Sequence, residues 1–302
     1  MSGPCLRTGA SRVFGEVVES SVHLRTGAFR FLDELLSRAF TCGRGPLRFR
    51  PRAARVLRSA VSLLAATDLR IRTRVPELMD DPSLDAAAHD HALAGLVRLN
   101  RWSRSHRLLW DGVAAHARAV NAEGRALRVV DIATGSADAP IAMDAWARRA
   151  GLRIEWTLCD RSAHVLEVAA SRARAAGLAA TTVEADAVGG ALPCEGDVAI
   201  CSLFLHHCDP DDVTRVLAHM AGAATRAVGV TDLDRTRAGL ALAWLGSRAL
   251  SRSPIVHFDA VASVRAAFTR DEIATMARNA GLEGAVVRRA WPERWTLWWR
   301  RA

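Results

Sequence analysis

Three aspartates and one glycine stand where ligand chemistry is expected, each in or directly after a predicted strand. Asp131 and Gly135 belong to VVDIATGSADAP, Asp160 ends the next strand in LCDRS, and Asp186 follows the third in VEADAVGG. Ligands of an open α/β sheet bind at the carboxyl ends of its strands, so these residues are expected to meet at one edge. A carboxylate at Asp160 can accept hydrogen bonds from two ribose hydroxyls, and one at Asp186 from an exocyclic amine. Each aspartate alone is commonly a loop residue or a helix cap, but the set favours a nucleoside ligand.

The loop after the first strand lacks the features that bind phosphates. Gly135 lets a ligand approach the backbone, but the loop is not G-x-G-x-x-G and has no second glycine for a dinucleotide pyrophosphate. A P-loop is excluded because the chain contains no lysine. The loop therefore suits a nucleoside without phosphates better than NAD or ATP.

Two adjacent histidines end the fourth predicted strand, in SLFLHHCDPDD. A neutral imidazole at His206 or His207 can act as the general base for a phenol or another hydroxyl near pH 7; the alternative is a pair that only orders the loop. Asp232 ends the fifth strand and can orient a histidine, bind a substrate hydroxyl or form a turn. A metal site with Cys201 and Cys208 is disfavoured, because adjacent histidines do not easily face one ion. We therefore predict no metal.

Strands and helices alternate around these residues. Short apolar strands are predicted at 127–131, 154–159, 181–185, 198–203 and 227–231, and two more at 285–289 and 295–299. Helices are predicted at 139–150, with Asp138 as its N-cap, and at 163–176, 210–221 and 269–280, the last with a Thr269–Glu272 capping box. This rhythm predicts a Rossmann-like, doubly wound α/β fold with a seven-stranded, mostly parallel sheet.

Two apolar helical segments lie outside this alternation and are predicted to act as lids. One is a helix at 85–118, and the other is the insertion at 237–267. Their aromatic residues either line an apolar acceptor pocket or pack the lids onto the sheet. The aromatic residues concerned are Trp102, Trp110, Trp244, Phe258 and Phe268.

The basic charge lies in the first quarter of the chain. Residues 1–75 hold 14 of the 41 basic residues and 5 acids, which accounts for the whole net charge of +9. We predict an extension at 1–75, partly helical or poorly ordered, followed by a catalytic domain at 76–302. Residues 48–66 comprise the run RFRPRAARVLRSA and the apolar stretch after it. They form either a loosely ordered extension or a helix that contacts a membrane surface or a partner. Nucleic-acid binding is disfavoured because few aromatic residues are interleaved with the arginines. No apolar run spans a bilayer, and the cysteines read as reduced thiols of a cytoplasmic protein.

The order VVDIATGSAD, LCDRS, VEADAVGGALP and DVAICSLFLHHCDPDD resembles the class I S-adenosylmethionine-dependent methyltransferases over about residues 125–300. It looks most like the small-molecule branch that includes the ubiquinone and menaquinone biosynthesis enzymes. The resemblance implies S-adenosyl-L-methionine as cofactor: the Asp131–Asp138 loop wraps its methionine part, Asp160 holds the ribose, and Asp186 with Ala187 faces the adenine. Where the family's loop carries its first and third glycines, this chain has Ala133 and Ala137. Arg161 and Ser202 complete the expected cofactor contacts.

The leading hypothesis is a methyltransferase acting on a hydroxyl, or less readily on a carbon or nitrogen, of an aromatic or lipid-like small molecule. Methyl transfer requires mainly alignment of the acceptor with the methyl group and exclusion of water. The first alternative is a non-catalytic binding protein of the same fold. The second is a nicotinamide-dependent oxidoreductase, disfavoured by the missing phosphate-binding glycines.

Overall fold

The computed structural model describes residues 63–64, 66–80, 83–103 and 105–302. Every described residue belongs to one unit of the chain, Pro51–Ala302. The extension predicted at 1–75 and the proposed membrane-contacting run at 48–66 thus lie largely outside the described residues. The domain boundary at 75/76 stays a prediction.

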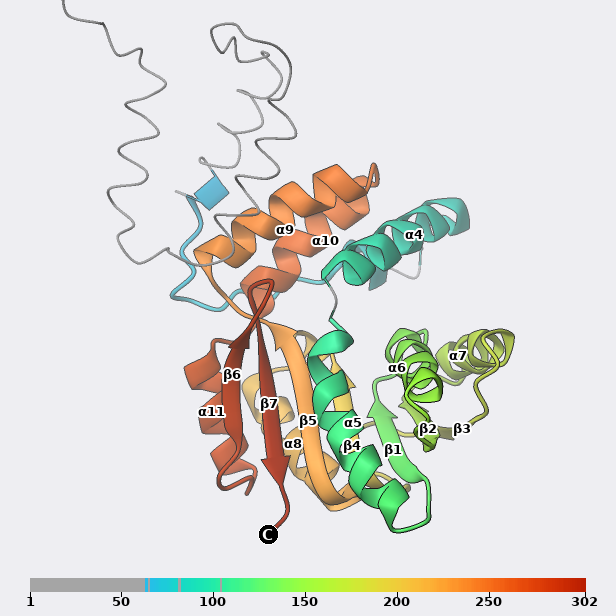
Figure 1. Ribbon diagram of the computed structural model, residues 1–302. Helices are drawn as coiled ribbons and strands as arrows, with labels where there is room; N and C mark the ends of the chain where they lie inside the picture. Colours follow the sequence, from blue (N-terminus) through green and yellow to red (C-terminus); the bar gives the residue numbers. More distant parts are fainter. Residues whose placement is uncertain (1–62, 65, 81–82, 104) are drawn as a thin grey trace, which may run out of the picture. The chain divides into compact units, whose positions relative to one another are not determined.

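Seven strands form one sheet (Figure 1). They are β1 (Leu127–Ile132), β2 (Ile154–Asp160), β3 (Ala180–Glu184), β4 (Gly196–Ser202), β5 (Ala224–Leu233), β6 (Val286–Ala290) and β7 (Arg294–Arg300). Their order across the sheet is β3-β2-β1-β4-β5-β7-β6. Strand β7 runs in the opposite direction to the other six strands. The predicted doubly wound, mostly parallel sheet is confirmed.

The described helices follow the strands as βα units or lie before and after them in the chain. They are η1 (Leu78–Asp80), α4 (Ala86–Ser103), α5 (Arg107–Ala122), α6 (Asp138–Arg149), α7 (Ala163–Ala175), η2 (Leu205–His207), α8 (Pro210–Ala223), α9 (Arg237–Leu250), α10 (Pro254–Ala266) and α11 (Arg270–Asn279). None of these is both long and apolar enough to span a bilayer.

Each face of the sheet has its own buried cluster. Side chains of α5, α6 and α7 cover one face, and side chains of α8 and α11 cover the other (Figure 1). The alternation of β7 serves both faces: Trp295 and Leu297 join the cluster of α8 and α11, while Trp298 packs against the cluster of α5. Because both faces are buried, the carboxyl ends of the parallel strands are left to carry polar groups.

The structure corrects the single lid helix predicted at 85–118. Two helices occupy this range, α4 and α5, and the chain bends between Ser103 and Arg107. The apolar spacing continues across the bend, which is why the sequence reads as one helix. Leu109 and Val113 of α5 are fully buried against the sheet, so α5 is part of the core rather than a lid. The insertion at 237–267 likewise forms two helices, α9 and α10, which contact each other and α4.

Candidate active site

The loop from β1 to α6 has an unusual backbone. Ala133, Gly135 and Ala137 all adopt left-handed conformations, with φ of 53°, 53° and 58°. These are the three positions where the family pattern has glycine. At two of them this chain has alanine, whose Cβ makes the left-handed conformation less favourable than it is for glycine. Ala137 is also the N-cap of α6, which corrects the prediction of Asp138 as cap; Asp138 is the first helical residue. A Cβ added at Gly135 would meet no atom within 4 Å, so the loop has open space beside it.

Two of the three predicted aspartates lie beside this loop. Oδ2 of Asp160 accepts a hydrogen bond from the Gly135 N–H at 3.1 Å, and its Oδ1 accepts one from the Ser162 N–H at 3.2 Å. Oδ2 of Asp131 accepts the hydroxyl of Thr134 at 2.7 Å. Burial raises the pKa of Asp131 to about 7, with a further contribution from the Asp160 carboxylate, while the bond from Thr134 opposes the rise. The structure therefore brings Asp131, Gly135 and Asp160 together.

The other predicted cofactor residues are placed around this group by the sheet register. Asp160 pairs with Glu184 across β2 and β3, so Asp186 and the buried Ala187 follow at the same edge. Asp186 is exposed and accepts the Val188 N–H at 2.9 Å, as a turn residue does. Arg161 is exposed after β2, and Ser202 is half-buried at the end of β4.

Asp138 makes contacts of its own within this loop. Its Oδ2 accepts the Ser136 hydroxyl at 2.9 Å, and its Oδ1 pairs with Arg172 of α7 at 2.6 Å. These contacts tie the loop to α7. Asp138 thus supports the loop in the structure, whereas a direct contact with a ligand stays a prediction.

The group around Gly135 fits a cationic nucleoside. Open space beside Gly135 gives a ligand access to the loop backbone, and each oxygen of Asp160 keeps a second lone pair for a ribose hydroxyl. Asp131 supplies a carboxyl that a nearby positive charge would ionise.

His206 and Asp232 form a buried pair at the ends of β4 and β5. Nδ1 of His206 lies 2.7 Å from Oδ1 of Asp232, and the His206 backbone N–H donates to Oδ2 at 3.1 Å. Burial alone would lower the pKa of His206, but the charge and hydrogen bond of Asp232 outweigh it and raise that pKa above its ordinary value. Burial opposes the ionisation of Asp232, yet His206 holds its pKa below the usual range. The ionised carboxylate can only accept, so Nδ1 carries the proton and Nε2 is the free basic atom.

His207 has a different environment. Its ring centroid lies 4.2 Å from that of His206, and burial together with the neighbouring His206 lowers the pKa of His207 to about 3. His207 is therefore neutral throughout the physiological range. The structure brings both predicted histidines to the site, but only His206 has a carboxylate partner on its ring.

Glu77 lies close to the His206–Asp232 pair, although it belongs to none of the motifs found in the sequence. Its Oε1 lies 3.9 Å from Nε2 of His206 and accepts a hydrogen bond from the Ser263 hydroxyl. The sequence around it, VPELMDD, reads only as a turn, and no local pattern marks Glu77 as a site residue.

Two arginines fix the segment before Glu77 to the histidine loop. Arg72 donates through Nη2 to the carbonyls of His206 at 2.9 Å and Cys208 at 2.7 Å, and through Nε to that of Ala266 at 2.6 Å. Arg74 donates to the carbonyl of His207 at 2.8 Å. We call residues 67–77 the N-terminal strap. The strap is held mainly by main-chain acceptors, which sequence inspection cannot identify.

Glu77, His206 and His207 have ligand atoms within 4.8 Å of one another, a spacing that a metal ion could bridge. The two imidazole rings are tilted by 36° relative to each other, and Nδ1 of His206 is already bonded to Asp232. The absence of a metal stays a prediction.

The aromatic residues proposed to line an acceptor pocket mostly pack the core. Trp110 is buried and meets Trp146 of α6 edge to face, with centroids 5.7 Å apart. Phe268 is buried beneath the guanidinium of Arg72 at 4.0 Å. Trp244 is buried, whereas Phe258 is 44% exposed; the side chain of Trp102 lies outside the described set. Trp110 and Phe268 therefore pack the protein interior and do not line a pocket.

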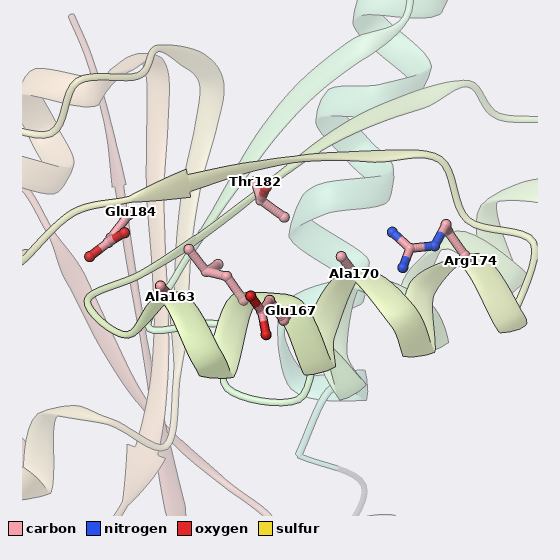
Figure 2. Close-up of a pocket in the computed structure, with 7 residues that line it drawn as sticks. Ala163, Glu167, Ala170, Arg174, Thr182 and Glu184 are labelled. Carbon is pink, nitrogen blue, oxygen red and sulfur yellow. The ribbon is translucent and has the colours of Figure 1, made fainter.

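A cavity of about 430 Å³ lies between α7 and the edge strand β3 (Figure 2). None of its lining residues belongs to the predicted site. It is lined by Ala163, Leu166, Glu167, Ala170, Arg174, Thr182 and Glu184. We therefore do not assign it to the reaction.

Comparisons with known proteins agree with this arrangement. Residues 129–226 match a family model described as a methyltransferase domain. The chain is similar to the crystal structure of a Nostoc punctiforme protein assigned as an O-methyltransferase, with 20% identity, a TM-score of 0.51 and coverage of 89% of this chain and 83% of that one. It is also similar to the S-adenosylmethionine-dependent methyltransferase SibL, with 21% identity, a TM-score of 0.51 and coverage of 82% and 70%.

At these identities, the similarity to the two structures supports the fold alone. A search of the curated proteins found no match to this chain. The predicted branch within the superfamily stays a prediction. The chain therefore contains a region, residues 129–226, that matches a methyltransferase domain, and the central strands of the sheet and the loop after β1 belong to that region.

Proposed function

We propose that this methyltransferase transfers the methyl group to a hydroxyl of an apolar or aromatic small molecule, with His206 as general base. The observation that carries the proposal is the 2.7 Å contact between Nδ1 of His206 and Oδ1 of Asp232 at the carboxyl edge of β4 and β5. A hydroxyl oxygen becomes a good nucleophile only as it loses its proton, so a base of this kind suits an oxygen acceptor.

The histidine acts through the nitrogen that Asp232 leaves free. With Nδ1–H donating to Asp232, Nε2 of His206 can take the proton of the acceptor hydroxyl while its oxygen takes the methyl group. The imidazolium that forms is stabilised by Asp232, and Glu77 at 3.9 Å adds a second carboxylate. His207, with a pKa of about 3, is too weak a base for this step.

S-adenosylmethionine supplies an activated methyl group on a cationic sulfur when it is bound. In our proposal Asp160 accepts hydrogen bonds from the ribose hydroxyls. The loop of Ala133, Gly135 and Ala137 contacts the methionine part, and Asp186 and Ala187 face the adenine. Asp131 favours the positive charge of the ligand. Asp138, Arg161 and Ser202 complete the contacts. The chain's remaining task is to align the acceptor and exclude water.

An oxygen acceptor has support from outside the site as well. The similar Nostoc punctiforme protein is assigned as an O-methyltransferase. In this chain we expect the acceptor to lie beside the apolar helices α9 and α10, because α10 contacts η2, which carries His206. Buried residues of these two helices include Leu240, Leu242 and Val256. These features favour an apolar acceptor, which we expect to be aromatic or lipid-like.

The test uses the full chain and a panel of phenols. We expect S-adenosylhomocysteine to bind by calorimetry and labelled methyl groups to appear on at least one phenol. The variant His206→Gln should keep cofactor binding and lose transfer, whereas His164→Gln, at an exposed position of α7, should keep both. Absence of cofactor binding would refute the proposal. Binding without transfer over the whole panel would favour the non-catalytic alternative.

A further inference from the structure

Arg294 is a buried cation with unused hydrogen-bond donors. It begins β7 and is 5% exposed. Nη2 donates to the hydroxyl of Ser103 at 2.9 Å, but Nε and Nη1 are buried without any hydrogen-bond partner. Buried polar groups of folded proteins are nearly always satisfied, so two unpaired nitrogens on one guanidinium call for an explanation.

The charge of Arg294 is also unpaired. Among the residues that the structure describes, no carboxylate forms an ion pair with it. Burial lowers the pKa of Arg294 to about 10, and the Asp232 carboxylate only partly opposes this. The guanidinium therefore remains charged at neutral pH. Charged side chains are almost never fully buried unless they are paired.

Further polar groups gather around the same point, at the bend between α4 and α5. The hydroxyl of Ser103 that receives Nη2 of Arg294 lies 2.9 Å from the hydroxyl of Ser105, and both serines are buried. The next residue, His106, also has a buried Nδ1 without a partner. Burial keeps His106 neutral by lowering its pKa, and the Arg294 charge acts in the same direction. An arginine, two hydroxyls and an imidazole are thus gathered at one buried, positively charged place.

The register of the sheet places this group next to the proposed reaction. Arg294 pairs with Leu233 across β5 and β7, and the adjacent pair is Asp232 with Trp295. His106 lies at the start of α5, and its pKa responds to Asp138 of the cofactor loop. The group therefore lies at the end of β5 and β7 that carries Asp232, and Asp138 of the cofactor loop is near enough to act on the pKa of His106.

Ser103 donates its own hydroxyl proton to the Asn100 carbonyl at 3.1 Å, so it orients Arg294 as an acceptor. We propose that Arg294, oriented by Ser103, forms a buried anion-binding subsite that takes the carboxylate of a bound small molecule. An arginine donates several N–H groups in fixed directions and matches a carboxylate better than other side chains do. The carboxylate belongs to the acceptor or to the methionine end of the cofactor. This inference rests on the proposed methyl transfer for its location, but not for its chemistry.

The test compares carboxylate ligands with neutral or truncated counterparts. Calorimetry with the full chain measures S-adenosylhomocysteine against 5′-methylthioadenosine, which lacks the amino-acid end. It then measures benzoate against benzamide, added to the protein saturated with S-adenosylhomocysteine. The variant Arg294→Met removes the charge at similar volume. The control Arg300→Met changes an exposed arginine of the same strand.

We expect Arg294→Met to weaken one carboxylate ligand by roughly 10- to 100-fold and to leave its counterpart unchanged. A loss confined to benzoate assigns the subsite to the acceptor, and a loss confined to S-adenosylhomocysteine assigns it to the cofactor. If Arg294→Met does not fold, Arg294→Lys and Ser103→Ala replace it, with the same selective loss expected. Unchanged affinity for both carboxylates in a folded variant overturns the proposal. Wild-type protein that binds no S-adenosylhomocysteine refutes the proposed function instead, and benzoate binding to the free protein then still tests the subsite.

Discussion

The ring of His206 is held by Asp232 at 2.7 Å through Nδ1, and both residues are almost completely buried. This contact fixes which nitrogen of the ring is basic. It raises the pKa of His206, whereas burial and the neighbouring His206 lower the pKa of His207, so the two histidines shift in opposite directions. Because of this contrast, the proposed roles can be distinguished by experiment.

The pH dependence of methyl transfer distinguishes the two histidines. A base must be deprotonated to act, and the pKa of His206 lies above the ordinary 6.5. With saturating S-adenosylmethionine, which keeps Asp131 ionised, we therefore expect kcat/KM for the acceptor to rise with pH through a single step above pH 6.5. His207, with a pKa of about 3, would give no histidine step between about pH 5 and 9. The measurement is kcat/KM across this range with a phenol of ordinary pKa, and a flat profile would argue against His206.

Asp232→Asn removes the charge and leaves a side chain of the same shape. The amide can donate to Nδ1, which favours the wrong tautomer and withdraws support for the imidazolium. We expect kcat to fall by roughly 10²- to 10⁴-fold while S-adenosylhomocysteine binds as before. Asp211→Asn, at an exposed position in the first turn of α8, serves as control. An unchanged kcat in Asp232→Asn would exclude the pair from the reaction.

Glu77→Gln tests the contribution of the N-terminal strap. Glu77 is one of the carboxylates that raise the pKa of His206, so its loss should move the pH profile toward lower pH. At pH 9, where the base is deprotonated in both proteins, we expect kcat/KM to change by less than about tenfold. A profile at the wild-type position would mean that Glu77 does not act on His206. Cofactor affinity, measured in parallel, should not change.

Gly135→Val should disable the cofactor loop. The added side chain occupies the open space beside the loop, and a β-branched residue is strained at φ of 53°. We expect affinity for S-adenosylhomocysteine to fall at least about tenfold. Gly124→Val is a matched control, because Gly124 also has positive φ and free space but precedes β1 at the other edge of the sheet. It should lose similar stability and keep cofactor binding; equal loss of binding in both variants would count against a role for Gly135.

Asp131 should release a proton when the cationic cofactor binds. With a pKa of about 7, about half of these carboxyls are protonated at pH 7, and a nearby positive charge favours ionisation. Calorimetry in two buffers of different ionisation enthalpy should show up to about half a proton released, and Asp131→Asn should abolish the difference. Since the folded state holds the proton more tightly, wild-type stability falls as pH rises from about 4 to 7. We therefore expect Asp131→Asn to be the more stable protein at pH 8 without ligand.

The sequence predicts the parts of this molecule that depend on neighbouring residues. The capping box of Thr269 and Glu272 forms as expected because its partners are three residues apart, and the strands of the sheet are marked by their apolar runs. The strand-end aspartates follow from topology, since parallel strands bring their carboxyl ends to one edge.

Contacts between distant residues could not be predicted in this way. Arg72 bonds carbonyls 134 and 136 positions later in the chain, and carbonyl oxygens carry no residue-specific signal. Glu77 and His206 are likewise far apart in the sequence. Arg294 directly precedes the strand predicted at 295–299, and its unpaired nitrogens become visible only in the structure. The bend between α4 and α5 was missed because apolar spacing continues through it.

The bonds of Arg72 have a consequence for the proton affinity of His206. One guanidinium joins the N-terminal strap to the loop after β4 and to the end of α10. Glu77 belongs to the same strap and is one of the groups that raise the pKa of His206. The basicity of this histidine therefore depends on a segment that precedes the sheet in the chain, and it reaches its final value only when that segment lies in place.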